Sequence, residues 1–240
     1  MELELFILIC FLASMIHVIG GFGGTMLAMP FTILIFGAQD AKTLMTGISI
    51  VGTLYPVVRY WRHLQFSALK KMLLFMIVGA AAAQLAGPAL YSETVLILYG
   101  LMVVAVGISS FIPKKEVKLP KAVDNGILFL AGLIHGAFLS GGALLAIYSI
   151  KNFKEKDQMR TTISAIWLII NSFVLITTIL SGAMTPHLTG MVMKAQIPCI
   201  LGILLGDYLQ SKMDQKKFRT FVNVMLLISG IVLLYNCFFG

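Results

Sequence analysis

The chain has 240 residues, of which 59% are hydrophobic and only 12% are charged, and its mean hydropathy is +0.95. Apolar runs of about 20 residues, enough to cross a bilayer core of about 30 Å, follow one another along the sequence, which predicts an all-α polytopic membrane protein and excludes a separate soluble domain. The net charge of +8 does not predict nucleic-acid binding, because loop lysines and arginines usually set the orientation of a membrane protein.

The first half of the chain, residues 1–113, is expected to contain one broken hairpin and three transmembrane helices. The hairpin covers residues 3–36, and its middle reads MIHVIGGFGGTMLAMP, with a histidine and four glycines between apolar flanks. The start of the chain lacks the basic residues of a secretory signal, so this segment is expected to stay in the protein. The predicted helices that follow cover 41–61, 69–90 and 93–112.

The second half, residues 121–240, repeats the first half after a cytoplasmic linker at 114–120. A shift of 118 residues, without gaps, aligns ICFLASMIHVIGGFGGTMLA with ILFLAGLIHGAFLSGGALLA, and ten of the twenty positions are identical. Chance would give about two identities for this composition. The repeat therefore predicts a second hairpin at 124–150 and further helices at 160–181, 188–209 and 217–238.

Basic residues predict the orientation of both halves. Of the 18 lysines and arginines, 16 fall in four short loops, which are expected to face the cytoplasm. Only the segment 124–150 separates the second loop from the third, so this segment should enter and leave the membrane on the same side. The stretch before Gly141 has about 15 residues, or about 22 Å of helix, and about 8 to 10 residues follow Gly142, so neither stretch is expected to cross alone.

The two halves are therefore predicted to be inverted repeats. Each repeat has a re-entrant, broken-helix hairpin plus three transmembrane helices, and this odd number of crossings places both termini outside. Eight ordinary spans in parallel repeats remain the alternative.

The glycine breaks are the candidate substrate site. Backbone N–H and C=O groups that are unpaired inside a bilayer must be buried in protein or line a polar cavity. Where the helices resume after the glycines, free N–H groups and positive dipole ends favour an anion. The residues expected to bind the substrate are His17, Gly21, Gly23, Gly24, Thr25, Arg59, His135, Ser140, Gly141, Gly142 and Asn171.

Several of these side chains have two interpretations, and both stay open. Each histidine either donates to the anion or carries a proton, or else it is neutral and pins its hairpin through a hydrogen bond to a carbonyl group. Arg59 either attracts anions or extends to the membrane surface. Asn171 either lines the cavity or joins two helices, and the same alternatives apply to Ser49, Thr53 and Gln84.

The segments GGFGGTMLAMP, YWRHLQFSALKKMLL and LSGGALLAIY, together with the twofold layout, resemble the sulfite exporter TauE/SafE family over nearly the whole chain. The glycine-rich pattern of that family corresponds to Gly21, Gly23, Gly24, Thr25 and Pro30, and in the second half to Gly141 and Gly142. The resemblance implies a multi-pass transporter of the bacterial plasma membrane, often an exporter, for small anions such as sulfite or an organosulfonate.

The expected function is a secondary transporter that works by alternating access at a site near the bilayer midplane. The expected partners are a small anion, a coupled proton or the anion gradient itself, and membrane lipid, with a homodimer left open and no cofactor, metal ion or nucleic acid. A passive anion channel and a metal or cation permease that uses the paired histidines remain alternatives. An enzyme is not expected, because the spans lack a nucleophile with a base and a carboxylate pair.

Overall fold

The computed structural model describes residues 2–20, 23–109, 120–153, 155–210, 212 and 215–239. This part of the chain is helical, with two short 3₁₀ helices, η1 (Trp61–His63) and η2 (Gly87–Tyr91), on either side of α3. The α-helices are α1 (Glu2–Gly20), α2 (Gly24–Tyr60), α3 (Phe66–Ala86), α4 (Glu93–Ser109), α5 (Lys121–Phe138), α6 (Gly142–Asn152), α7 (Lys156–Leu180), α8 (Pro186–Gln210) and α9 (Gln215–Phe239).

Several of the described helices have the length and composition of membrane spans. Large apolar side chains such as Leu85 and Leu180 are exposed on the outside of the molecule, where lipid can cover them. The prediction of an all-α, multi-pass membrane protein is confirmed. Within the described ranges, five stretches are long and apolar enough to cross a bilayer, namely Glu2–Ile19, Gly24–His63, Phe66–Ala86, Gln158–Leu180 and Pro186–Leu209.

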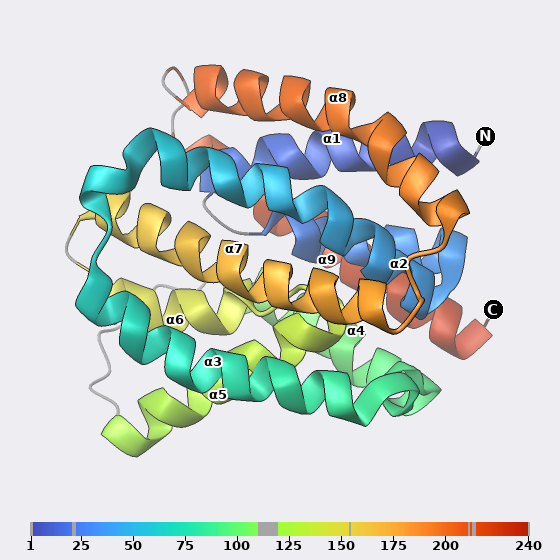
Figure 1. The fold of residues 1–240 in the computed structure, drawn as a ribbon, viewed down its shortest axis with the longest axis horizontal. Coiled ribbons are helices and arrows are strands. Elements are labelled where there is room, and N and C mark those ends of the chain that lie inside the picture. Colours follow the sequence, from blue (N-terminus) through green and yellow to red (C-terminus); the bar gives the residue numbers. More distant parts are fainter. Residues whose placement is uncertain are drawn as a thin grey trace.

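The chain reverses its direction twice near its start. α1 runs inward from the end of the molecule where both termini lie, the first part of α2 returns to that end, and the rest of α2 crosses the molecule (Figure 1). Gly37 separates the two parts of α2, because its φ of 77° and ψ of 164° are not helical. A positive φ strains residues that carry a Cβ atom, and glycine avoids this strain.

The helices α5, α6 and α7 follow a similar course from the opposite end of the molecule. α5 runs inward, α6 returns to the end where α5 began, and α7 crosses toward the termini (Figure 1). α5 has 18 residues, or about 27 Å of helix, and is therefore longer than the arm of about 15 residues expected from the sequence. α6 has 11 residues, or about 16 Å, and is too short to cross a bilayer alone.

Glycines bring the backbones of paired helices from the two halves into contact. α1 packs against α8, α3 against α5, and α4 against α9. A Cβ atom at Gly79 of α3 would lie 2.1 Å from the carbonyl oxygen of Phe129 in α5. A Cβ atom at Gly202 of α8 would lie 2.4 Å from the carbonyl oxygen of Phe11 in α1. Side chains do not fit at these distances, so the close packing of these pairs depends on glycine.

The variant Gly132→Ala is expected to destabilise the protein, because its Cβ atom would lie 2.1 Å from the carbonyl oxygen of Met76 and force α3 and α5 apart. Overpacking of this kind costs about 1–3 kcal/mol, so the midpoint of thermal unfolding in detergent should fall by about 2 °C or more. Gly126→Ala is the matched control on the same helix, since no atom lies within 4 Å of a Cβ atom there. Equal midpoints for the two variants would contradict this packing.

Candidate functional site

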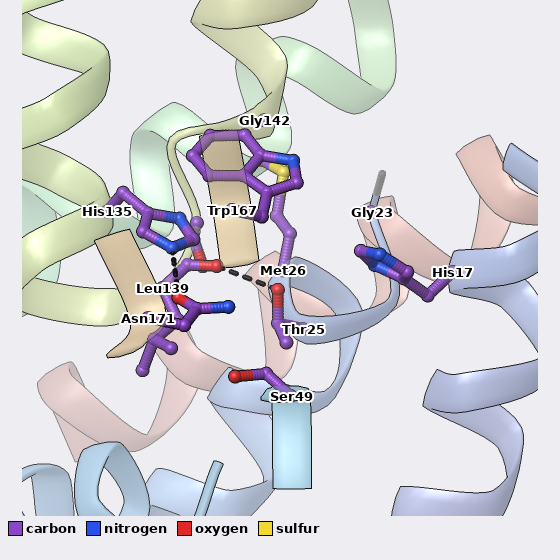
Figure 2. Close-up of a pocket in the computed structure, with 11 residues that line it drawn as sticks. His17, Gly23, Thr25, Met26, Ser49, His135, Leu139, Gly142, Trp167 and Asn171 are labelled. Carbon is purple, nitrogen blue, oxygen red and sulfur yellow. Dashed lines mark hydrogen bonds between the residues drawn. The ribbon is translucent and has the colours of Figure 1, made fainter. Parts of the chain in front are cut away.

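The two breaks in the helices meet inside the protein. α2 starts directly after Gly23, whose φ of 99° lies in the left-handed region. α6 starts shortly after Leu139, which has a left-handed φ of 50°. The hydroxyl of Thr25 donates a hydrogen bond of 2.7 Å to the carbonyl oxygen of Leu139 (Figure 2). This bond joins the two breaks, although 114 positions separate the two residues in the sequence.

The first turns of α2 and α6 border one cavity. Neither helix start has a side-chain cap. In α2 the N–H of Leu27 bonds to the carbonyl oxygen of Gly23 at 2.9 Å, and in α6 the N–H of Leu145 bonds to that of Gly141 at 3.1 Å. The N–H groups that precede Leu27 and Leu145 in these helices have no carbonyl partner in their own helix, and they carry the positive end of the helix dipole.

The cavity is small, and both polar and apolar groups line it. About 10 Å³ is open to the centre of a water-sized sphere, which is room for about one water molecule. Among the described residues, no lysine, arginine, aspartate or glutamate lines it. The lining residues are His17, Gly23, Thr25, Met26, Ser49, His135, Leu139, Ser140, Gly142, Trp167 and Asn171.

His135 is held on one edge and one face. Its Nε2 atom lies 2.6 Å from Oδ1 of Asn171, so that the imidazole N–H donates to the amide oxygen (Figure 2). Its ring stacks on Trp167, with 4.0 Å between the ring centroids and 20° between the planes. Both contacts come from α7, so they fix the orientation of the imidazole and tie the end of α5 to α7.

His17 lies across the cavity from His135 and is held differently. Its imidazole extends from α1 toward the space beside Gly23 and Thr25 (Figure 2). The side chain is 8% exposed, and its Nε2 atom is buried with no hydrogen-bond partner among the described residues. This nitrogen is therefore available to a ligand.

The hydroxyl of Ser140 is already engaged within the protein. It donates to the carbonyl oxygen of Phe138 at 2.8 Å and lies 2.7 Å from the hydroxyl of Tyr99, which therefore donates to it. The ring of Tyr99 also stacks on Phe138, with centroids 4.4 Å apart. The sequence suggested that Thr25 and Ser140 add hydroxyl donors to the ligand site, but both hydroxyls donate to backbone carbonyl groups at the second break.

Two of the predicted glycines lie behind the cavity rather than in its lining. A Cβ atom at Gly24 would lie 2.1 Å from the carbonyl oxygen of Ala13, and one at Gly141 would lie 2.1 Å from that of Ala131. Ala13 and Ala131 are equivalent positions of the repeat, so the two halves share this contact. The glycine that makes it differs by one position, because the ungapped alignment pairs Gly24 with Gly142 and not with Gly141. The predicted residues that line the cavity are His17, Gly23, Thr25, His135, Ser140, Gly142 and Asn171.

The other candidates lie elsewhere. Arg59 is exposed near the end of α2, with its guanidinium carbon 5.8 Å from the ring centre of Tyr60, and it is not part of the cavity lining. Gln84 accepts a hydrogen bond from Lys42 and donates one to the carbonyl oxygen of Gly136, so it joins helices. Gly21 lies outside the described residues.

Three lining residues were not considered from the sequence, namely Met26, Leu139 and Trp167. Trp167 lies four residues before Asn171 in a predicted helix, so helical spacing placed both on one face and could have identified it. Leu139 contributes its backbone, and an apolar side chain in the sequence carries no signal of that role. Ser49, considered as a lining residue, borders the cavity.

The variant Thr25→Val is expected to lower the midpoint of thermal unfolding, because it leaves the buried carbonyl oxygen of Leu139 without its donor. An unpaired buried group costs about 1–3 kcal/mol, which corresponds to about 2 °C or more for a chain of this size. Thr32→Val is the matched control on the same helix, since that hydroxyl donates only to the carbonyl oxygen of Ala28 one turn earlier. If both variants unfold at one temperature, the bond between the breaks contributes nothing.

The glycine pattern and the paired breaks can be compared with known proteins. No curated protein and no solved structure matches the chain. The model of the family described as Sulfite exporter TauE/SafE matches residues 6–233, which is nearly the whole chain. The resemblance seen in the sequence is therefore confirmed, and the chain belongs to the sulfite exporter TauE/SafE family of membrane transporters.

Proposed function

We propose that the protein is a secondary transporter that exports a small sulfur-containing or organic anion, such as sulfite or an organosulfonate. The observation that carries this proposal is the convergence of two helix starts, from α2 and α6, on one cavity that also contains His17 and His135. Helix starts supply free N–H donors and a positive dipole end, and both favour an anion. Membership of the sulfite exporter family supports the same substrate class.

We further propose that residues 1–113 and 121–240 are inverted repeats, each with a re-entrant hairpin and three transmembrane helices. The opposite directions from which α1 and α5 approach the cavity support this arrangement (Figure 1). So do the glycine contacts between α4 and α9. A Cβ atom at Gly107 would meet the side chain of Leu227 at 2.8 Å, and one at its counterpart Gly230 would meet that of Val104 at 2.7 Å.

The size of the cavity supports alternating access. An anion with three oxygen atoms is larger than the single water molecule for which the cavity has room. The substrate therefore enters only when the helices around the breaks move apart on one side. In transporters with inverted repeats, such openings arise from rocking of one half against the other around a fixed site.

The polarity of the cavity favours an anion over a metal ion. A cation would need carboxylates, carbonyl groups or helix ends around it. Two helix starts border this cavity, and its described lining has no acidic side chain. The end of α5 borders it as well, but the carbonyl oxygen of Leu139 there already accepts from the Thr25 hydroxyl. Across the described ranges, no group of three or more His, Cys, Asp and Glu side chains could hold a metal ion.

We propose that the basic loops lie in the cytoplasm and that both termini lie outside, in the plasma membrane of a bacterium. The α2–α3 and α6–α7 connections, which carry basic residues, lie at the end of the molecule opposite to the termini (Figure 1). Short loops rich in lysine and arginine stay on the cytoplasmic side.

Purified protein in liposomes should carry sulfite with saturable kinetics and should exchange internal for external sulfite. The double variant His17→Ala/His135→Ala should lower the flux by about tenfold or more, because a hydrogen bond to a charged ligand contributes about 1.5–3 kcal/mol and 1.4 kcal/mol is a factor of ten. Unimpaired flux in a folded double variant would refute the site.

The same assay distinguishes the modes of transport. Flux that rises linearly with the sulfite concentration and shows no exchange would identify a channel. A response of the flux to an imposed pH gradient would identify proton coupling.

The orientation can be tested with single cysteines in a background that lacks Cys10, Cys199 and Cys237. Ser92 and Ser181 are exposed near the ends of helices on the proposed outer side, and Ser67 is exposed at the start of α3. A membrane-impermeant maleimide added to intact cells should label Ser92→Cys and Ser181→Cys but not Ser67→Cys until the cells are opened. The reverse pattern would place the termini in the cytoplasm.

A further inference from the structure

We infer that the two histidines have different tasks: His17 binds the transported oxyanion directly through its Nε2–H, whereas His135 is a positioning residue that holds the second break in place. This inference rests on the proposed function, because it assigns the ligand contact within the same cavity. The sequence repeat suggests that the two histidines share one role. The inference instead gives ligand binding to His17 and the positioning of the break to His135.

The repeat provides a direct comparison of the two surroundings. A shift of 118 residues pairs His17 with His135. The same shift pairs Ser49 with Trp167 and Thr53 with Asn171. The positions that surround one histidine in α7 are therefore matched by positions in α2, but the residue types differ.

In the second half these positions hold the imidazole firmly. Asn171 accepts from Nε2 of His135 at 2.6 Å, and Trp167 covers one face of the ring at 4.0 Å. Nδ1 of His135 is buried without a partner among the described residues, but with the proton on Nε2 this nitrogen cannot donate to an anion. The carbonyl oxygen of His135 also accepts a hydrogen bond of 2.7 Å from the N–H of Leu139, the residue that receives the Thr25 hydroxyl. His135 therefore connects α7 to the backbone of the break itself.

In the first half the matched side chains do not reach the imidazole. The hydroxyl of Ser49 donates to the carbonyl oxygen of Thr46 at 2.8 Å. The hydroxyl of Thr53 donates to the carbonyl oxygens of Ser49 and Ile50 at 2.9 and 3.0 Å. Both hydroxyls donate within their own helix, and Nε2 of His17 has no partner in the part of the chain that the structure describes.

A buried nitrogen without a partner is destabilising, and such groups are uncommon in folded proteins. The side chain of His17 is only 8% exposed to solvent. It extends into a cavity that is bordered by two helix starts without side-chain caps. A ligand oxygen that accepts a hydrogen bond from Nε2–H would give this nitrogen the partner that it lacks among the described residues. The ligand must bring several acceptor oxygens for the helix N–H groups as well, which describes sulfite or a sulfonate.

The first test compares His17→Leu with His135→Leu, two variants at equivalent positions. Thermal unfolding of the purified proteins in detergent is measured alone, with sodium sulfite and with sodium 2-hydroxyethanesulfonate. Both salts should raise the midpoint of the wild-type protein, because a ligand held by the folded state stabilises it.

His17→Leu should unfold at the wild-type midpoint or above it without ligand, since the unpaired nitrogen is gone, and neither salt should raise its midpoint. His135→Leu should unfold about 2 °C or more below wild type, because Asn171 and Trp167 lose their contacts, and the salts should still raise its midpoint. A ligand effect that persists in His17→Leu overturns the inference. So does a loss of that effect in a His135→Leu variant as stable as wild type.

The second test transfers the asparagine to the first half. Thr53→Asn should give Nε2 of His17 an amide partner, raise the midpoint without ligand, and weaken sulfite binding by about tenfold or more, the effect of about 1.4 kcal/mol. Thr53→Val is the control, because it removes a hydroxyl that serves only its own helix, and its response to sulfite should equal that of wild type. Wild-type sulfite affinity in a Thr53→Asn variant with a raised midpoint overturns the inference.

Failure of the proposed function gives a different result. In that case neither salt raises the wild-type midpoint. The ligand-free midpoints then still decide between the two histidines, and a His17→Leu variant less stable than His135→Leu overturns the division of tasks.

Discussion

Backbone groups that a helix leaves unpaired need partners, and lipid offers none. In this protein the two places where helices are interrupted lie against each other. The hydroxyl of Thr25 at one break donates a hydrogen bond to the carbonyl oxygen of Leu139 at the other. The carbonyl of Leu139 at the second break therefore takes its side-chain donor from the first half of the chain. The position of the cavity, the direction of the two helix dipoles and the contacts of both histidines all depend on this meeting of the breaks.

The contacts around the breaks divide the polar groups into two sets. The hydroxyls of Thr25, Ser140 and Ser49 all donate to backbone carbonyl groups and are occupied. The N–H groups at the two helix starts have no partner within their helices, and neither has Nε2 of His17. Apart from Nδ1 of His135, which is an acceptor without a partner among the described residues, the groups left over are donors. This excess of donors supports the proposed anionic ligand.

Close packing joins helices of the two halves. Where α3 meets α5 and α1 meets α8, glycines let the backbones touch, so these pairs are tightly packed. Each of these pairs joins a helix that leads into a break, α1 or α5, to a helix of the other half. In the proposed alternating access, a movement of one pair relative to the other would change access to the cavity while each pair remains intact.

Local signals in the sequence were sufficient for the class of protein and for the location of the breaks. Composition predicted a helical membrane protein, and the glycine-rich stretches pointed to the family that the comparison confirms. The same stretches pointed to His17 and His135, and Asn171 stood out as a polar residue within a predicted span; the fold brings all three to one cavity. The helix ends were harder to predict: α5 starts at Lys121, because nothing in its polar first turn prevents helix formation before the apolar run.

The sequence by itself determined what each segment is: mostly apolar, interrupted next to a pair of glycines, and duplicated. Only the tertiary structure decided which polar groups meet. Arg59 had the charge expected near an anion but lies outside the cavity, whereas Trp167 and the carbonyl of Leu139 belong to it. The repeat made His17 and His135 look alike, but packing against α7 gives a side-chain partner to Nε2 of His135, and Nε2 of His17 has none among the described residues. Apolarity and helix breaks are properties of neighbouring residues, but a hydrogen bond between residues 114 positions apart depends on how the whole chain packs.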